Sequence, residues 1–247
     1  MSEDIIMPNI VAISASPRGE KSEGYLYCKE LLTKVTELAN KKTTFKIYHP
    51  KNIHIQTCMG DKNCFNKGYC LLDNTDDMKK IKQDMLNADT IVFVTPIMCQ
   101  NISTDMKKIL ERIGYWGHLF SLTGKTGIIV TTSTSNGNKF VGDYLTKMMY
   151  SLGVLPIKVI HIANLYNKEE TYKQITETAQ YITKFTDKKC IPAVSKEQEK
   201  FFNDMRGIYL GLENNKDYAY EYNEWVNSRM FNYDDFQDFF TRKFLTN

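Results

Sequence analysis

Short apolar runs of strand length alternate with longer amphipathic stretches along most of this chain. The apolar runs cover 9–14, 43–48, 89–96, 126–132 and 155–162. Stretches with the apolar spacing of a helix cover 22–40, 75–87, 103–115, 138–152 and 168–186. The runs IVFV and IIV are apolar without alternation, which is typical of strands buried on both faces of a sheet. The order predicts an α/β fold, a parallel sheet with helices on both faces.

The stretch 49–74 falls outside this alternation because its apolar residues show no clear period. A loop of this length is uncommon in a compact domain and is often functional. We expect the helix that follows it to be capped by Asn74 or Thr75.

The alternation of apolar runs and helical stretches ends at about residue 190. A further helix is expected at 195–211. Ten aromatic residues then follow within 218–244: Tyr218, Tyr220, Tyr222, Trp225, Phe231, Tyr233, Phe236, Phe239, Phe240 and Phe244. A free tail of this kind would expose an apolar patch that monomers avoid, so it packs either on its own domain or on a second subunit. We therefore divide the chain into a domain at 1–190 and a C-terminal helical extension at 191–247.

Length and charge narrow the class of protein. The 247 residues suffice for one large α/β domain with an appendage. A net charge of +3 offers no electrostatic basis for binding nucleic acid or an anionic membrane. No run reaches the ~18 apolar residues that span a bilayer, and the acidic first residues do not resemble a signal peptide. We expect a cytoplasmic protein that binds neither nucleic acid nor membrane.

The loop after the first strand carries groups suited to a phosphate. Ser16 and Ser22 offer hydroxyls, and Arg18 offers a charged fork. Gly19 and Gly24 allow close backbone approach, and the start of the next helix favours an anion. Ligands of doubly wound sheets bind beyond the carboxyl ends of the strands, where this loop lies. An ordinary strand–helix turn with an N-cap serine is the alternative. The motifs G-x-x-x-x-G-K-[ST] and G-x-G-x-x-G are both missing from the sequence.

This loop, SASPRGEKSEGY, resembles the flavin phosphate loop of the NADPH-dependent FMN reductase group of flavodoxin-like proteins. The matching residues are Ser16, Pro17, Arg18 and Ser22. Ala15 stands where glycine is common, and Gly24 stands where a second hydroxyl is common.

Two later stretches are similar to the other flavin loops of this group, in the same order. TPIMCQNISTDMKKILERI follows the third strand, with Met98 in place of the usual tyrosine and Glu111 in place of the aspartate before Arg112. TTSTSNGN follows the fourth strand and looks like the third flavin loop. The resemblance spans roughly residues 8–162, and its specificity rests on three loops in order, each after a strand.

The resemblance implies a flavodoxin-like, five-stranded parallel sheet in the order 2-1-3-4-5 that binds FMN without a covalent bond. The implied cofactor-binding residues are Ser16, Arg18, Ser22, Gly24, Tyr25, Pro96, Ile97, Met98, Cys99, Asn101, Thr132, Ser133, Ser135 and Asn136. It implies an oxidoreductase that uses NAD(P)H to reduce a quinone, a flavin, a nitro compound or a dedicated metabolite, with no catalytic acid or base required of a side chain. It also implies a homodimer or a higher homo-oligomer.

Three of the six cysteines lie close together, with the spacing C-x5-C-x5-C. Clustered thiolates suggest a metal rather than disulfides in a chain without a signal peptide. Zinc would need a fourth ligand, and His49 and His54 lie just upstream. The remaining cysteines are Cys28, Cys99 and Cys190.

The iron–sulfur flavoproteins, a branch of the same group, carry C-x2-C-x2-C-x(4–7)-C at this place. The alignment implies the ligand set Cys58, Asp61, Cys64 and Cys70, with an aspartate in the second position. Three alternatives are open: a [4Fe–4S] cluster that uses Asp61, a three-iron cluster on the cysteines, and a segment without a cluster. With a cluster, the alternative function is an FMN/iron–sulfur carrier of electrons between redox-protein partners. A flavodoxin-like protein that has lost its flavin is a third reading.

Overall fold

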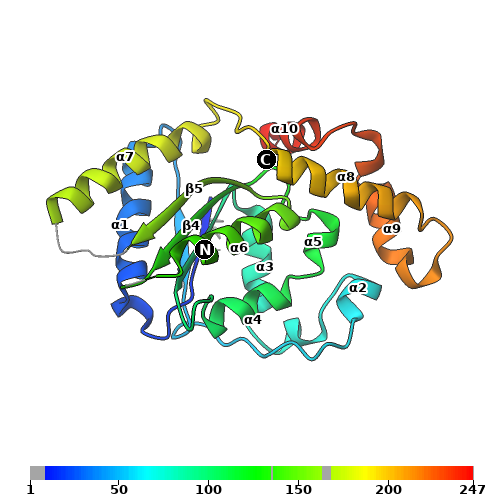
Figure 1. The fold of residues 1–247 in the computed structure, drawn as a ribbon, viewed down its shortest axis with the longest axis horizontal. Helices are drawn as coiled ribbons and strands as arrows, with labels where there is room; N and C mark the ends of the chain where they lie inside the picture. The colour runs from blue at the N-terminus through cyan, green and yellow to red at the C-terminus, as the bar shows by residue number, and fades with distance from the viewer. Residues whose placement is uncertain (1–8, 135, 163–167, 247) are drawn as a thin grey trace, which may run out of the picture.

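A computed structural model describes residues 9–134, 136–162 and 168–246 of the chain (Figure 1). Five strands form one parallel sheet in the order β2-β1-β3-β4-β5, which confirms the predicted order. They are β1 (Ile10–Ser14), β2 (Phe45–Tyr48), β3 (Thr90–Pro96), β4 (Thr126–Thr132) and β5 (Leu155–Ile162). The reversal of strand order between β1 and β3 creates a crevice at the carboxyl edge of the sheet, where ligands of such folds bind.

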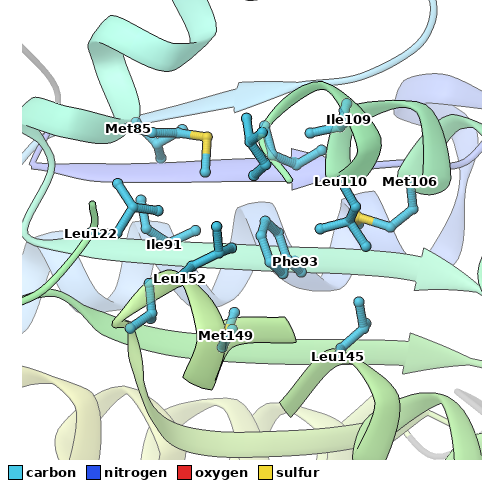
Figure 2. Close-up of a cluster of buried hydrophobic side chains, with 14 of the residues drawn as sticks. Met85, Ile91, Phe93, Met106, Ile109, Leu110, Leu122, Leu145, Met149 and Leu152 are labelled. Atoms are coloured by element: carbon cyan, nitrogen blue, oxygen red, sulfur yellow. The ribbon is translucent and has the colours of Figure 1, made fainter. Parts of the chain in front are cut away.

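Helices cover both faces of the sheet, so its central strands are apolar on both sides. One face packs against α1 (Glu23–Leu38) and α7 (Lys168–Thr186). The other packs against α3 (Met78–Asn87), α4 (Thr104–Arg112), α5 (Trp116–Leu119) and α6 (Asn138–Leu152). Figure 2 shows Ile91 and Phe93 of β3 among Met85, Met106 and Met149, which come from three of these helices.

The C-terminal extension forms three helices that pack on the domain itself. They are α8 (Lys196–Leu210), α9 (Ala219–Asn227) and α10 (Phe236–Thr246). The ring of Phe120, which precedes β4, lies 5.4 Å from that of Phe202, 5.9 Å from Trp225 and 5.5 Å from Phe236. Most of the aromatic residues of the extension thus form a third apolar cluster beside the sheet domain, whereas Tyr218 is exposed. None of the described helices is both long and apolar enough to cross a membrane.

The long loop predicted at 49–74 contains two short helical segments, α2 (Asn63–Lys67) and a 3-10 turn at Leu71–Asn74. The predicted cap of α3 was wrong: its N-cap is Asp77, and neither Asn74 nor Thr75 caps it. Asn74 ends the 3-10 turn, and the Thr75 amide donates to the Leu72 carbonyl. The Met78 amide instead donates to the Asp76 carboxylate at 2.9 Å.

Candidate functional site

The three loops predicted to bind a flavin meet at the carboxyl edge of the sheet. Hydrogen bonds continue past the strand ends, from the Ala15 amide to the Val94 carbonyl at 2.8 Å and from the Ile97 amide to the Thr132 carbonyl at 2.9 Å. The Ser103 hydroxyl, at the N-cap of α4, donates to the Ala15 carbonyl at 2.5 Å. The first loop is therefore joined to the second, and the second to the third.

In the first loop, Ser22 serves as the N-cap of α1. Its hydroxyl donates to the Gly19 carbonyl at 2.8 Å and accepts from the Tyr25 amide at 3.3 Å, so Ser22 shapes the loop from within. Gly19 has φ +60°, a conformation that a glycine adopts without strain. Ser16 accepts a hydrogen bond from the Arg18 amide at 3.3 Å, which leaves its own O–H for a ligand.

The electrostatics of this loop fit an anion. The amides of Glu23 and Gly24 face out of the helix end, as the first amides of any α-helix do, and the dipole of a 16-residue helix adds to them. Arg18 is exposed on the same loop and adds a guanidinium. The donor set of hydroxyl, amides and guanidinium is the one that a phosphate requires. The residues present thus fit the phosphate of FMN.

Gly24 has a packing role in the structure. A Cβ atom at this position would lie 2.9 Å from Val94 Cγ1 and 3.2 Å from Thr132 Cγ2. The glycine therefore lets α1 approach β3 and β4 directly beneath the loop. This contact explains why a second hydroxyl residue does not fit at Gly24.

His49, whose sequence position indicated only a candidate metal ligand, lies beside the phosphate loop. Its buried ring packs edge-on against Tyr25, with 5.4 Å between the centroids. Its Nδ1 accepts from the Lys51 amide at 3.3 Å, and its Nε2 lies 3.4 Å from Glu20 Oε1. Because His49 directly follows β2, which lies beside β1, the predicted strand order already placed it at this edge.

The second loop contains a tight turn from Met98 to Asn101. These two residues exchange backbone hydrogen bonds of 2.8 and 2.9 Å. The central residues Cys99 and Gln100 both have positive φ, 48° and 66°. A turn of this type favours Asn-Gly, so two side chains are held here in a backbone conformation that costs of order 1–3 kcal/mol each. Such strain is concentrated at functional sites.

The third loop packs against this turn. Gln100 Nε2 donates to Asn136 Oδ1 at 2.9 Å, and the Ser133 hydroxyl donates to the Asn136 carbonyl at 2.8 Å. A Cβ atom on Gly137 would lie 3.0 Å from Ile97 Cγ2, so the two loops are in close contact. The structure thus brings together the predicted residues of all three loops, except Ser135, which lies outside the described residues.

The cysteine segment, residues 58–70, lies along a different part of the domain. Cys58 is exposed, whereas Cys64 and Cys70 are half-buried. The Asp61 carboxylate accepts from the Asn63 amide at 3.0 Å, at the start of α2. Across the described parts of the chain, no three His, Cys, Asp or Glu side chains are placed to hold a metal ion. The four predicted ligands are therefore not gathered, although burial, together with Cys70 and Cys58, raises the pKa of the Cys64 thiol.

A buried charge network anchors the end of this segment. The guanidinium of Arg112 donates to the Gln56 carbonyl at 3.1 Å, to Asp73 at 2.7 Å and to Asp76. Lys82 of α3 also contacts Asp73, at 2.7 Å. Arg112 thus ties α4 to the chain on both sides of the cysteines, a role that its place in the second flavin motif did not indicate.

Comparison with known sequences agrees with this geometry. Residues 8–168 match the profile of the family described as NADPH-dependent FMN reductase. The chain belongs to the NADPH-dependent FMN reductase family. The matched range contains all three loops, whereas α8, α9 and α10 lie beyond it.

Two curated relatives are iron–sulfur flavoproteins of Archaeoglobus fulgidus. One is 27% identical over 149 residues, which are 60% of this chain and 64% of the relative. The other is 26% identical over 157 residues, which are 61% of this chain and 73% of the relative. The chain therefore spans less than two thirds of the first relative.

Solved structures share the fold. An FMN-dependent NADH-azoreductase from Bacillus anthracis, in complex with FMN, matches with a TM-score of 0.55 at 16% identity, over 72% of this chain and all of the other (100%). A flavone reductase matches with a TM-score of 0.53 at 18% identity, over 71% of this chain and 62% of the other. Both likenesses support the flavodoxin-like fold of the sheet domain.

Proposed function

We propose that this protein is an NAD(P)H-dependent FMN oxidoreductase that reduces a small molecule. The observation that carries the proposal is the junction of three loops at one edge, where an anion-binding helix start lies beside a strained turn. Membership of the FMN reductase family supports the same cofactor. The substrate classes that fit the family are quinones, flavins, nitro compounds and a dedicated metabolite.

The residues of the edge bind and orient rather than transfer protons. Ser16, Arg18 and the first amides of α1 hold the phosphate, and the backbone of 96–101 borders the ring. Polar groups at Thr132, Ser133 and Asn136 face its pyrimidine edge. When bound, FMN supplies the acceptance and donation of hydride, so the protein's part is placement and exclusion of water. A second subunit completes the face on which nicotinamide and substrate stack.

The test is FMN binding by apoprotein, followed through the quenching of flavin fluorescence. We expect Arg18→Gln to weaken FMN binding about tenfold or more, because the guanidinium–phosphate bond is charge-assisted. Arg242→Gln is the matched control, since Arg242 is an exposed arginine paired with Asp238 on α10. Equal affinities for the two variants, or a protein that takes up no FMN, would overturn the proposal.

An FMN/iron–sulfur electron carrier is the second candidate. The names of the curated relatives favour it, and so does the electrostatic influence of Cys58 and Cys70 on Cys64. Protein purified without oxygen decides between the two through its visible spectrum and its iron and sulfide content. Flavin bands without iron, with turnover of NAD(P)H and a quinone, support the reductase. Several irons per chain, with turnover only from reduced ferredoxin, support the carrier.

A further inference from the structure

A cleft of about 690 Å³ lies between the cysteine segment and the C-terminal extension. Its walls come from α2 on one side and from the 3-10 turn Lys216–Tyr218 and α9 on the other, with His118 of α5 between them. The volume lies within the range of small-molecule sites. In Figure 1 the arrowheads of β4 and β5 point away from α5 and α9, so this cleft is remote from the three flavin loops.

His118 is held by four residues from three helices, α2, α8 and α9. Its Nδ1 lies 2.9 Å from Glu221 Oε1, and its own carbonyl accepts from Trp225 Nε1 at 2.9 Å. The ring of Phe65 packs against it, with 5.1 Å between the centroids. Tyr209 donates its O–H to Glu221 Oε2 at 2.7 Å. A ring fixed in this way is preorganised, as the side chains of binding sites are.

Behind the ring, Glu221 and Tyr209 are each only 2% exposed, whereas 43% of the His118 side chain is exposed. Burial and the neighbouring carboxylate raise the pKa of Tyr209, which keeps its O–H as a donor to Glu221. Because a carboxylate only accepts, the Nδ1–H of His118 donates to Glu221. In the neutral ring, Nε2 is then a hydrogen-bond acceptor at the cleft, oriented by a buried carboxylate.

The rest of the cleft supplies aromatic walls and positive charge. Phe65, Tyr218 and Tyr220 present rings to it, and Lys62 and Lys216 are exposed at its rim. Asp217 offsets one of these two charges at the rim, and the Glu221 carboxylate, which also lines the cleft, is buried and bonded to His118 and Tyr209. A ligand that matches this set has a flat ring, a carboxylate for the lysines and a hydroxyl for Nε2.

We propose that this cleft binds a small hydroxylated aromatic acid, with His118 Nε2 accepting its hydroxyl and Lys62 and Lys216 holding its carboxylate. The site joins the family domain to the extension beyond the family match. It is separate from the flavin edge and does not depend on the proposed reductase activity.

The probe is 4-hydroxybenzoate, titrated into the full-length protein by calorimetry and followed through the ring resonances of the four histidines. Benzoate lacks the hydroxyl, and phenol lacks the carboxylate. We expect a saturable shift of the His118 resonance with 4-hydroxybenzoate. His118→Asn should lower the affinity for 4-hydroxybenzoate about tenfold and leave the affinity for benzoate unchanged, because only the contact with the hydroxyl is lost.

The double variant Lys62→Gln/Lys216→Gln alters two exposed side chains and should weaken both acids about tenfold, with no effect on phenol. Lys67→Gln, on α2 but outside the cleft lining, is the matched control and should bind as the unchanged protein does. No saturable heat up to about 10 mM probe would overturn the proposal. Equal loss of benzoate and 4-hydroxybenzoate in His118→Asn would overturn it as well, since a merely structural histidine gives that result.

Discussion

Arg112 and Asp76 form an ion pair in which neither side chain is exposed to solvent. The pair joins the end of α4 to the chain just before α3, and Asp73 supports it from the other side at 2.7 Å. A buried pair of this kind supports the stability of the fold only while both partners are present, since the loss of one leaves an uncompensated charge in the interior.

Asp76→Asn should therefore lower the free energy of unfolding by about 3 kcal/mol, because Arg112 would keep its charge with Asp73 alone to balance it. Urea denaturation measures the change. The control is Asp204→Asn, which removes an exposed pair with Lys200 on α8 and should cost less than about 1 kcal/mol. Similar losses of unfolding free energy in both variants would show that the buried network stabilises the protein no more than an exposed ion pair does.

The same pair predicts a dependence of stability on pH. Burial alone would raise the pKa of Asp76, but hydrogen bonds from Arg112 and from the amides of Gln56 and Met78 lower it below its ordinary value. A lowered carboxyl pKa contributes stability above the unfolded value of about 3.9 and loses it as the pH falls through the folded value. The stability difference between the unchanged protein and Asp76→Asn should therefore shrink below about pH 4, as urea midpoints at several pH values can show.

Gly24→Ala should destabilise the protein by about 1–3 kcal/mol, because its methyl group would press on Val94 and Thr132 under the first flavin loop. Gly207→Ala is the control. Nothing lies within 4 Å of a Cβ atom at this exposed position on α8, so alanine should raise the free energy of unfolding by about 0.5–1 kcal/mol. Thermal unfolding of both variants tests the contrast. A neutral Gly24→Ala would mean that α1 can move away from the sheet.

At Cys99 we expect a substitution to stabilise the protein rather than to destabilise it. Cys99→Asn should stabilise the protein by about 0.5–1 kcal/mol, because asparagine tolerates positive φ better than cysteine does. Cys99→Val should destabilise it, since a β-branched residue is strained there. Denaturant midpoints would distinguish them, and equal midpoints would argue against strain at this position.

The buried side chain of Lys125 should make the protein more stable as the pH becomes alkaline. Burial lowers its pKa to about 8, while Asp89 opposes the shift, and its Nζ donates to the Leu86 and Ala88 carbonyls. Between about pH 8 and about pH 10.4 the unfolded chain binds more protons at this lysine than the folded one, so stability rises with pH. Relative to Lys125→Met, the unchanged protein should gain stability across this range. A constant difference between the two proteins would contradict the assignment.

Most element positions could be predicted because they depend on local periodicity, whereas the strand order was implied by the resemblance of the loops to those of the FMN reductase group. The apolar run around Ile91 indicated a strand covered on both faces, and α6 and β5 occupy the predicted ranges 138–152 and 155–162. The start of α3 could not be predicted in this way. Asp76 is fixed by Arg112, 36 positions further along the chain, and that contact decides where the helix begins.

The candidate site shows the same division. The first loop was predictable from its place at the carboxyl end of a strand, and the other two from their resemblance to the flavin loops of the family. The packing of Gly24 on Val94 and the place of His49 beside Tyr25 depend on contacts between distant segments, which no local motif records. The cysteine spacing predicted a shared ligand set, but within the described residues no three of these side chains are placed to hold a metal ion.

Phe120 belongs to the part of the chain that matches the family, but its aromatic neighbours Phe202, Trp225 and Phe236 all come later. During translation the sheet domain therefore leaves the ribosome before the residues that cover this ring have been synthesised. Until residues 202–236 have left the ribosome, the nascent domain carries an open apolar surface, and an interruption of synthesis in this interval should yield a species that chaperones retain.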